Sequence, residues 1–283
     1  MPALPRIPYS DSEADLLQPA MSHPFFPTQR PANDAALCAE ISRLAYCKFE
    51  ADPAARQKVK ETLAAIGFQV QDANLFAVAR AKGYLATSPH LAVLAFRGTE
   101  ATNIRDLLTD AEFPLENWVK GGRAHEGFSD AIHQIWPAVV PALEQVAGPI
   151  YFTGHSLGAA LATLASSLHR PTALYTIGSP RVGDQAFTLT LAGLRAERYE
   201  DCCDIVCQVP FEELDYVHYS QAIFIRQDGA IVPNMPLPAI KADQHQARVK
   251  YLREHFPKSG TVPVRDLADH APINYVSALM GLR

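Results

Sequence analysis

Residues 150–158 read IYFTGHSLG, and residues 159–165 continue as AALATLA. The apolar beginning predicts a β-strand and the alanine-rich end predicts a helix, so the Gly-x-Ser-x-Gly pentapeptide forms a sharp turn between them. Such a turn pushes Ser156 into solvent, and glycines flank the serine because side chains there would collide with the strand and the helix. The first N–H groups of the helix point toward whatever the hydroxyl attacks. The alternative is an ordinary glycine-rich connection with no catalytic role, but the flanking strand and helix favour a nucleophilic serine.

The composition is that of a folded protein with a substantial core, because 48% of the 283 residues are hydrophobic and 19% are charged. The 30 acidic and 25 basic residues are interspersed and give a formal net charge of -5. This charge argues against a nucleic-acid partner and against simple electrostatic docking on anionic lipid. No apolar run reaches the roughly 18 residues that a spanning helix needs, so we predict no transmembrane segment. Any contact with lipid must therefore be apolar.

The chain is expected to consist of a proline-rich N-terminal extension, residues 1–30, and one α/β domain, residues 31–283. The extension lacks the apolar core of a secretory signal. The cysteine count is five, which is odd. Cys202, Cys203 and Cys207 could suggest a metal site, but no second cysteine or histidine pair has matching spacing, so we expect buried reduced thiols and no metal. A cytoplasmic protein, or one exported without a cleavable signal, fits these features.

Strand-like and helix-like patterns alternate along most of the chain. Strands are expected at 75–81, 91–96, 150–153, 172–177, 195–200, 222–225 and 230–232. Helices are expected after the N-cap residue Asn33, from Asp52 to near Gly67, and over 126–146, 159–165 and 183–191, with Pro137 and Pro141 kinking or breaking the third. The alternation predicts a mostly parallel central sheet with helices on both faces, and the hairpin pattern at 222–232 predicts an antiparallel far edge.

Six short segments occur in order between residues 90 and 275: AFRGT (95–99), AHEGF (124–128), GHSLGAALA (154–162), GSPRVGD (178–184), DIV (204–206) and DH (269–270). Together they resemble the class 3 lipase family, an α/β-hydrolase group of triacylglycerol lipases, phospholipases A1 and related esterases. The conjunction of six segments is far more specific than any one of them. The resemblance does not reach the first thirty residues.

A catalytic acid must follow the nucleophile, because α/β-hydrolases carry their triad in the chain order Ser, Asp, His. Three candidates follow Ser156, namely Asp201, Asp204 and Asp215. Asp204 matches the position of the family's acid, just past the strand that ends near Glu200. A solvated loop aspartate is the alternative for this residue.

The base must come from the ten histidines. His270 matches the family's base, because it follows an acidic residue near the C-terminus and precedes a helix that begins with Pro272. His218 also follows Asp204 and remains an alternative. His155 lies inside the turn and points away from the nucleophile, so we expect it to pack beneath the turn.

The resemblance also implies an oxyanion hole and a lid. One donor to the oxyanion is the N–H of Leu157, the residue after the nucleophile, and Thr99 resembles the second donor. Ile104, Leu107 and Leu108 share one face of a short helix. This stretch resembles the family's amphipathic lid, although an ordinary surface helix packed on the core has the same spacing.

The resemblance implies a carboxylic ester hydrolase that acts on lipid acyl esters, as triacylglycerol lipases do, through an acyl-enzyme and without a metal or organic cofactor. Phospholipase A1 or short-chain esterase activity remains open, since the acyl groove is built from side chains scattered over loops. An acyltransferase could use the same site. A catalytically silent binding protein with the same fold is the alternative from another class. The sequence carries no sign of the oligomeric state.

Overall fold

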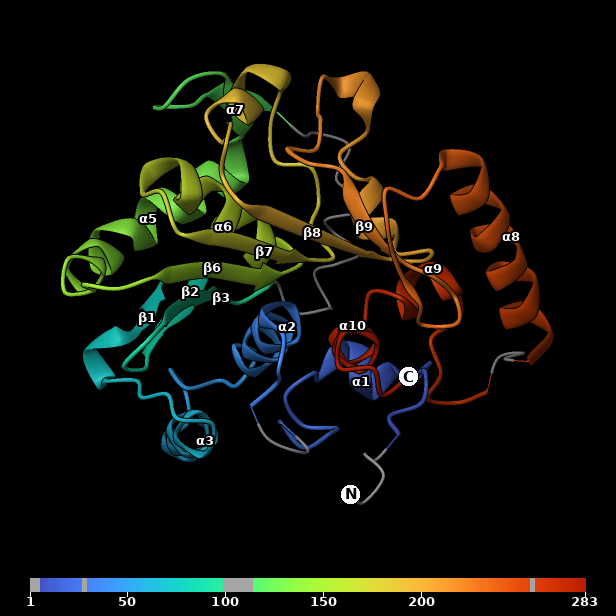
Figure 1. Ribbon diagram of the computed structural model, residues 1–283, viewed down its shortest axis with the longest axis horizontal. Helices are drawn as coiled ribbons and strands as arrows, with labels where there is room; N and C mark the ends of the chain where they lie inside the picture. The colour runs from blue at the N-terminus through green and yellow to red at the C-terminus, as the bar shows by residue number, and fades with distance from the viewer. Residues whose placement is uncertain (1–5, 27–29, 99–113, 255–257) are drawn as a thin grey trace.

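The computed structural model describes residues 6–26, 30–98, 114–254 and 258–283. These residues form a central sheet with helices on both faces, as Figure 1 shows. The predicted class, an α/β-hydrolase fold with a mostly parallel sheet, is confirmed. Among the described helices, none is both long enough and apolar enough to cross a membrane.

The sheet has the strand order β1-β2-β3-β6-β7-β8-β9-β10. Its strands are β1 (Leu75–Val78), β2 (Ala81–Thr87), β3 (Ala92–Phe96), β6 (Ile150–His155), β7 (Ala173–Ile177), β8 (Ala196–Asp201), β9 (Ala222–Ile225) and β10 (Ile231–Pro233). Strands β3, β6, β7, β8 and β9 pair in parallel, whereas β1–β2, β2–β3 and β9–β10 are antiparallel. The antiparallel far edge is therefore confirmed. Because parallel strands end at the same edge, the loops after β6 and β8 lie close together.

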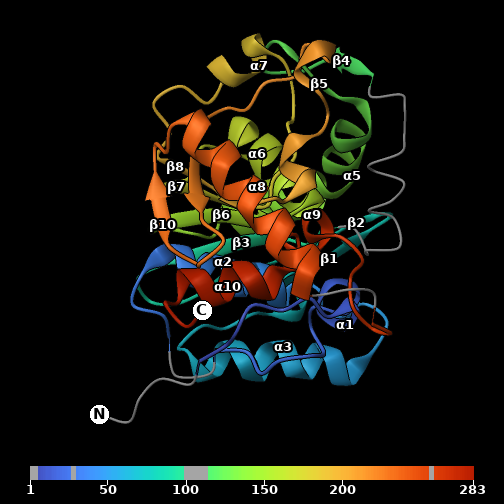
Figure 2. The same cartoon turned by 90° about the vertical axis from the view of Figure 1, so that its right-hand side faces the viewer.

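Helices cover the sheet in two layers (Figures 1 and 2). They are α1 (Glu13–Leu17), α2 (Asp34–Leu44), α3 (Pro53–Ala65), α5 (Glu126–Leu143), α6 (Leu157–Leu168), α7 (Gln185–Leu189), α8 (Leu237–Glu254), α9 (Arg265–Ala268) and α10 (Pro272–Leu279). Helices α5 and α6 lie on one face, and α2 and α10 lie on the other with α3 further out. Single turns of 3-10 helix occur at Asp72–Asn74, Ile205–Gln208 and Glu212–Leu214, and a separate hairpin joins β4 (Leu115–Asn117) to β5 (Arg123–His125).

The core occupies both faces of the sheet. Every residue of β3 and β7 is buried, which is typical of central parallel strands covered on both sides. Helix α6 packs closely through small side chains, since Ala160, Ala162 and Ala165 are fully buried against the sheet. The nucleophile turn is thus anchored between a buried strand and a buried helix.

The strand expected over 75–81 is wrong in its bounds. A turn at Ala79, whose φ is 46°, divides it, and β2 continues through Gly83 to Thr87. A Cβ at Gly83 would lie 2.6 Å from the carbonyl oxygen of Ala95 on β3. This glycine therefore allows close pairing inside the strand rather than separating two strands.

The break expected near Pro137 and Pro141 is also wrong, because α5 runs without interruption through both. A kink there stays a prediction. The two prolines are four residues apart and exposed on the same face of the helix. Carbonyl groups that lose a partner there can bond to water, which offsets part of the cost of proline in a helix.

Two other helices differ from the expectation. Helix α8 was not expected from the sequence, and α7 covers only five residues of the helix expected at 183–191.

All five cysteines are unpaired and buried, as expected for reduced thiols. The described part of the N-terminal extension packs against the end of the chain. The N–H of Ile7 donates to Leu282 O at 2.9 Å, and the N–H of Val262 donates to Asp11 O at 2.8 Å. The division at residue 30 into an extension and a single domain remains a proposal.

Candidate active site

Ser156 lies at the turn between β6 and α6 with φ 58° and ψ -130°, a backbone conformation that is costly for a residue with a side chain. The flanking glycines have a steric cause. A Cβ at Gly154 would come 2.2 Å from the carbonyl group of Gly158, and a Cβ at Gly158 would come 2.2 Å from Phe96 O on β3. The packing of strand against helix therefore holds the strained turn in place.

Three residues far apart in sequence meet above this turn. His270 Nε2 lies 2.9 Å from Ser156 Oγ, and His270 Nδ1 lies 2.8 and 2.9 Å from the two carboxylate oxygens of Asp204. Asp204 follows β8 and His270 lies between α9 and α10. The imidazole can thus accept the serine proton while the carboxylate fixes the opposite ring nitrogen as the N–H donor.

The predicted exposure of Ser156 is wrong, because the residue is fully buried. His270 is equally buried and lies at hydrogen-bond distance from the hydroxyl. Asp204 is buried too and accepts the N–H of Val206 at 2.9 Å. Burial strengthens the electrostatic interactions among the three side chains, since little water screens them.

The alternative acids have other partners. Asp201 pairs with Arg283 at 2.8 and 3.0 Å. Asp215 is exposed and lies 3.3 Å from Arg123. Among the described residues, Asp204 is the carboxylate that contacts this imidazole.

Of the alternative histidines, His155 is buried and His218 is half-buried, and both are bonded elsewhere. His218 Nε2 lies 2.8 Å from Cys207 O. His155 lies beneath the turn as expected, with Nδ1 2.7 Å from Tyr46 Oη and Nε2 2.9 Å from the main-chain oxygen of His270. Burial lowers the pKa of both well below its usual value, helped for His155 by His270 and for His218 by Arg198. Both rings are therefore neutral near pH 7.

Residues 93–214 match the family model described as lipase (class 3). The chain is 32% identical over 203 residues to secreted mono- and diacylglycerol lipase A of Penicillium camembertii, an alignment that covers 66% of this chain and 65% of the relative. Secreted mono- and diacylglycerol lipase 1 of Fusarium solani is 36% identical over 106 residues, or 34% of this chain and 31% of that relative. These matches make the chain similar to class 3 lipases. The chain spans about two thirds of the Penicillium relative.

Solved structures agree with these matches. The mono- and diacylglycerol lipase of Aspergillus oryzae superposes with a TM-score of 0.56 at 25% identity, over 68% of this chain and 78% of that one. A lipase from Rhizopus microsporus var. chinensis gives a TM-score of 0.60 at 24% identity, over 76% and 87% of the two chains, which supports the fold. The matched family segment includes Ser156 and Asp204 but ends before His270.

Of the two oxyanion donors expected from the sequence, Leu157 is described and Thr99 is not. Leu157 is the first residue of α6, where main-chain N–H groups have no partner within the helix. Thr99 and the lid residues Ile104, Leu107 and Leu108 lie outside the described residues. Their roles remain predictions.

Tyr275 is a contact of the candidate site that sequence reasoning missed. Its hydroxyl donates to Asp204 Oδ2 at 2.5 Å and accepts the N–H of Asp201 at 3.0 Å. Burial raises the pKa of Tyr275 well above its usual value, so the phenol remains a proton donor to the carboxylate. Its place in a helix five residues after His270 was the one available signal.

We expect Tyr275→Phe to lower kcat about 10-fold or more, because a hydrogen bond to a charged group contributes about 1.5–3 kcal/mol. Asp204 would still contact the imidazole of His270, but its carboxylate would lose the hydroxyl that helps to orient the carboxylate. Initial rates with a short nitrophenyl ester measure the effect. Tyr219→Phe is the matched control, since its hydroxyl bonds Thr176 at 2.6 Å rather than a triad residue. Equal kcat in Tyr275→Phe and the unmodified protein would contradict the expectation.

The two neutral histidines predict a loss of stability in mild acid. A histidine whose pKa is lowered in the folded state binds fewer protons there than in the unfolded chain. The free energy of unfolding therefore falls as the pH drops below about 6.5, by up to about 1.4 kcal/mol per pH unit for each histidine. Urea unfolding between pH 7.5 and 5 measures this slope. His218→Gln removes one titrating group and is expected to flatten the slope; an unchanged slope would argue against a neutral His218.

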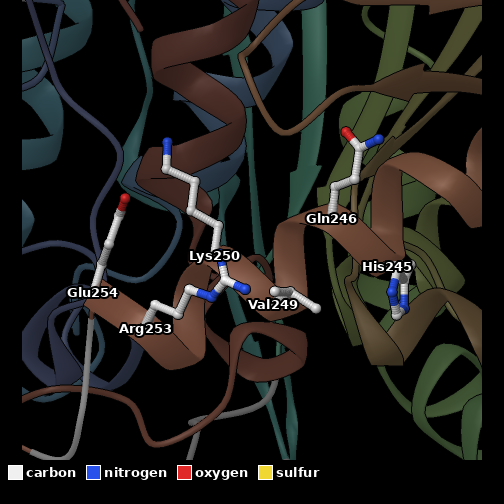
Figure 3. Close-up of a pocket in the computed structure, with 6 residues that line it drawn as sticks. All are labelled: His245, Gln246, Val249, Lys250, Arg253 and Glu254. Carbon is white, nitrogen blue, oxygen red and sulfur yellow. The ribbon is translucent and has the colours of Figure 1, made fainter.

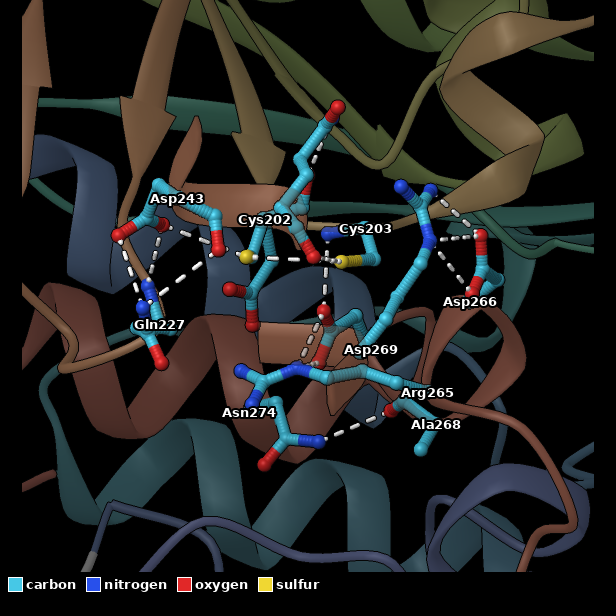
Figure 4. A network of polar contacts seen from close by, with 12 residues as sticks. Cys202, Cys203, Gln227, Asp243, Arg265, Asp266, Ala268, Asp269 and Asn274 are labelled. Atoms are coloured by element: carbon cyan, nitrogen blue, oxygen red, sulfur yellow. Dashed lines mark hydrogen bonds and ion pairs between the residues drawn. The ribbon is translucent and has the colours of Figure 1, made fainter. Parts of the chain in front are cut away.

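One group of side chains has the composition of a metal site. The candidate ligand atoms of Cys202, Cys203 and Asp269 lie within 4.8 Å of one another and are buried (Figure 4). However, the Asp269 carboxylate already accepts the N–H of Cys203 at 2.8 Å and faces Arg265 Nε at 3.1 Å. A cation would compete with this guanidinium, so we assign no metal to the group.

A hollow of about 380 Å³ lies along α8 (Figure 3). It is lined by side chains of this helix alone: His245, Gln246, Val249, Lys250, Arg253 and Glu254. Helix α8 stands at the edge of the molecule in Figure 1, whereas the nucleophile turn lies at the sheet. The hollow therefore contributes no residue to the candidate site.

Proposed function

We propose that this protein is a carboxylic ester hydrolase that acts on acylglycerol esters with Ser156, His270 and Asp204 as its triad. The observation that carries the proposal is the continuous series of contacts from Asp204 through His270 to Ser156, at 2.8 and 2.9 Å. The names of the Penicillium and Fusarium relatives, mono- and diacylglycerol lipases, support the substrate class.

In the proposed reaction Ser156 Oγ attacks the ester carbonyl carbon while His270 Nε2 takes the hydroxyl proton. The N–H of Leu157, together with Thr99, stabilises the negative oxygen of the tetrahedral intermediate. The carbon–oxygen ester bond breaks, and His270 returns its proton to the departing alcohol. Water then attacks the acyl-serine with the same histidine as base, which releases the fatty acid and restores the hydroxyl. Each step uses groups of the chain and water.

We further propose that Ile104, Leu107 and Leu108 belong to a lid that shields the site in water. The burial of Ser156 supports this proposal, because a buried nucleophile must be uncovered before an ester reaches it. Contact with a lipid–water interface would then be apolar. The five buried thiols fit a reducing compartment, whereas the named relatives are secreted.

A series of nitrophenyl and glycerol esters of increasing acyl length tests both proposals. We expect hydrolysis of the series, with a jump in rate where the longer substrates aggregate. Smooth saturation through the aggregation point would contradict the mobile lid alone. Absence of hydrolysis across the whole series would contradict the ester hydrolase. Added glycerol or methanol distinguishes hydrolysis from acyl transfer, since a transferase forms a new ester in preference to free acid.

A further inference from the structure

A buried carboxylate connects the two loops that carry Asp204 and His270. Asp269 directly precedes His270 and is fully buried. Its Oδ2 accepts the N–H of Cys203 at 2.8 Å, and Cys203 directly precedes Asp204 (Figure 4). One side chain therefore links the two loops directly.

An arginine holds this carboxylate from the opposite side. Arg265, one helical turn earlier, places Nε 3.1 and 3.2 Å from the two oxygens of Asp269. Figure 4 shows its guanidinium beneath the carboxylate, with Cys203 above. Asp269 is thus bonded both to its own helix and to the acid loop, and it cannot rotate without losing a charged contact.

The N-terminal extension contacts the same arginine. The Tyr9 ring lies with its centroid 4.7 Å from Arg265 Cζ and 4.9 Å from Arg283 Cζ, in the range of cation–π interactions. Arg283 in turn pairs with Asp201 at the end of β8, at 2.8 Å. One aromatic ring therefore contacts two guanidinium groups. Arg283 holds Asp201 at the end of β8, and Arg265 holds Asp269, which bonds the loop that carries Asp204.

A second contact joins the extension to the helix after His270. Asn274 is fully buried, and its amide donates to Ser10 O at 2.8 Å and accepts the N–H of Ser10 at 2.8 Å. The same amide donates to Ala268 O at 2.9 Å. One amide on the helix after His270 thus bonds both the main chain just before His270 and the extension.

We propose that Asp269 is a positioning residue for His270, and that residues 7–16 act with it by holding Arg265 and Asn274. The inference rests on the proposed ester hydrolysis. The bonds of these side chains go to the loops and helices around His270 rather than to Ser156, so they act through the position of the imidazole. Displacing the base by about 1 Å lowers the rate on the order of 100-fold, so the contacts that hold His270 in place affect turnover.

The test compares Asp269→Ala with Asp269→Asn in the full chain, using a short water-soluble nitrophenyl ester. We expect Asp269→Ala to lower kcat about 100-fold with KM nearly unchanged, because the histidine moves while ester binding does not. Asp269→Asn keeps an oxygen for the N–H of Cys203 and is expected to recover most of kcat. A smaller folded fraction would also lower the apparent kcat at unchanged KM, so each rate is divided by the folded fraction measured by circular dichroism.

Asp266→Ala is the matched control. Asp266 lies on the same short helix, but its carboxylate bonds Arg248 at 2.6 Å, away from both loops. We expect wild-type kcat from this variant. The proposal is overturned if Asp269→Ala keeps kcat within about threefold, or if Asp269→Asn loses as much as Asp269→Ala.

Tyr9→Leu provides a second variant in case Asp269→Ala does not fold. Amide hydrogen exchange over residues 201–206 and 266–272 is expected to accelerate in this variant, while exchange in β3 and β7 stays slow. Unchanged exchange in both loops overturns the role of the extension. This readout needs no ester, so it tests the role of the extension even if the unmodified protein hydrolyses no ester and the proposed function fails.

Discussion

Ser156→Ala is expected to lower ester turnover by about 10⁵-fold or more, because no acyl-enzyme can form without the hydroxyl and the remaining groups can only promote attack by water. The loss should appear in kcat rather than KM, since Ser156 Oγ contacts His270 in the resting site and alanine leaves the surrounding walls in place. Initial rates with a short nitrophenyl ester, measured on protein shown to be folded by circular dichroism, give the comparison.

Ser166→Ala is the control for the first prediction. Ser166 is buried on the same helix, α6, and its hydroxyl bonds the Ala162 carbonyl oxygen at 2.7 Å. This variant should retain full turnover. A phosphonate ester should add one covalent group to the unmodified protein at Ser156 and none to Ser156→Ala. Turnover within about tenfold of wild type in Ser156→Ala would contradict the proposed nucleophile.

The nucleophile turn could be predicted from sequence because its requirements are local. Gly154 and Gly158 are needed where strand and helix nearly touch, and an apolar strand followed by an alanine-rich helix has a recognisable pattern. The parallel order of the sheet followed from the alternation of strands and helices for the same reason. The exposure expected for Ser156 was wrong, because the segments that cover a residue can be distant from it in the sequence.

Contacts between loops that are distant in the sequence leave no local sequence pattern of this kind. Tyr275 and Asp269 reach Asp204 and Cys203 only because the loops after β8 and α9 converge, and nothing in the spacing of those residues shows this. Helix α8 was missed because its buried side chains are few, so its apolar periodicity is weak. Burial of a polar residue is a property of the assembled fold, which explains why bracing residues escape a reading of local sequence.

Asp204→Asn is expected to lower kcat about 10⁴-fold while leaving the fold intact. Aspartate accepts the N–H of His270 Nδ1 and so leaves Nε2 free to take the serine proton. An asparagine amide can instead donate to Nδ1, which favours the opposite tautomer and places a proton on Nε2. The hydroxyl would then face a donor rather than a base. Rates measured from pH 6 to 10 should partly recover at high pH, where hydroxide can replace the missing base.

Asp215→Asn separates this explanation from a general effect of removing a carboxylate. Asp215 was an alternative acid in the sequence, but it is exposed, pairs only weakly with Arg123 and has φ 66°. Asparagine tolerates that backbone conformation well, so the variant should fold and keep full turnover. If Asp215→Asn lost activity while Asp204→Asn kept it, the acid would have to be reassigned and His270 would need another partner. If both variants kept it, the histidine would not depend on a carboxylate, and the contacts of Asp204 would serve only the packing of its loop.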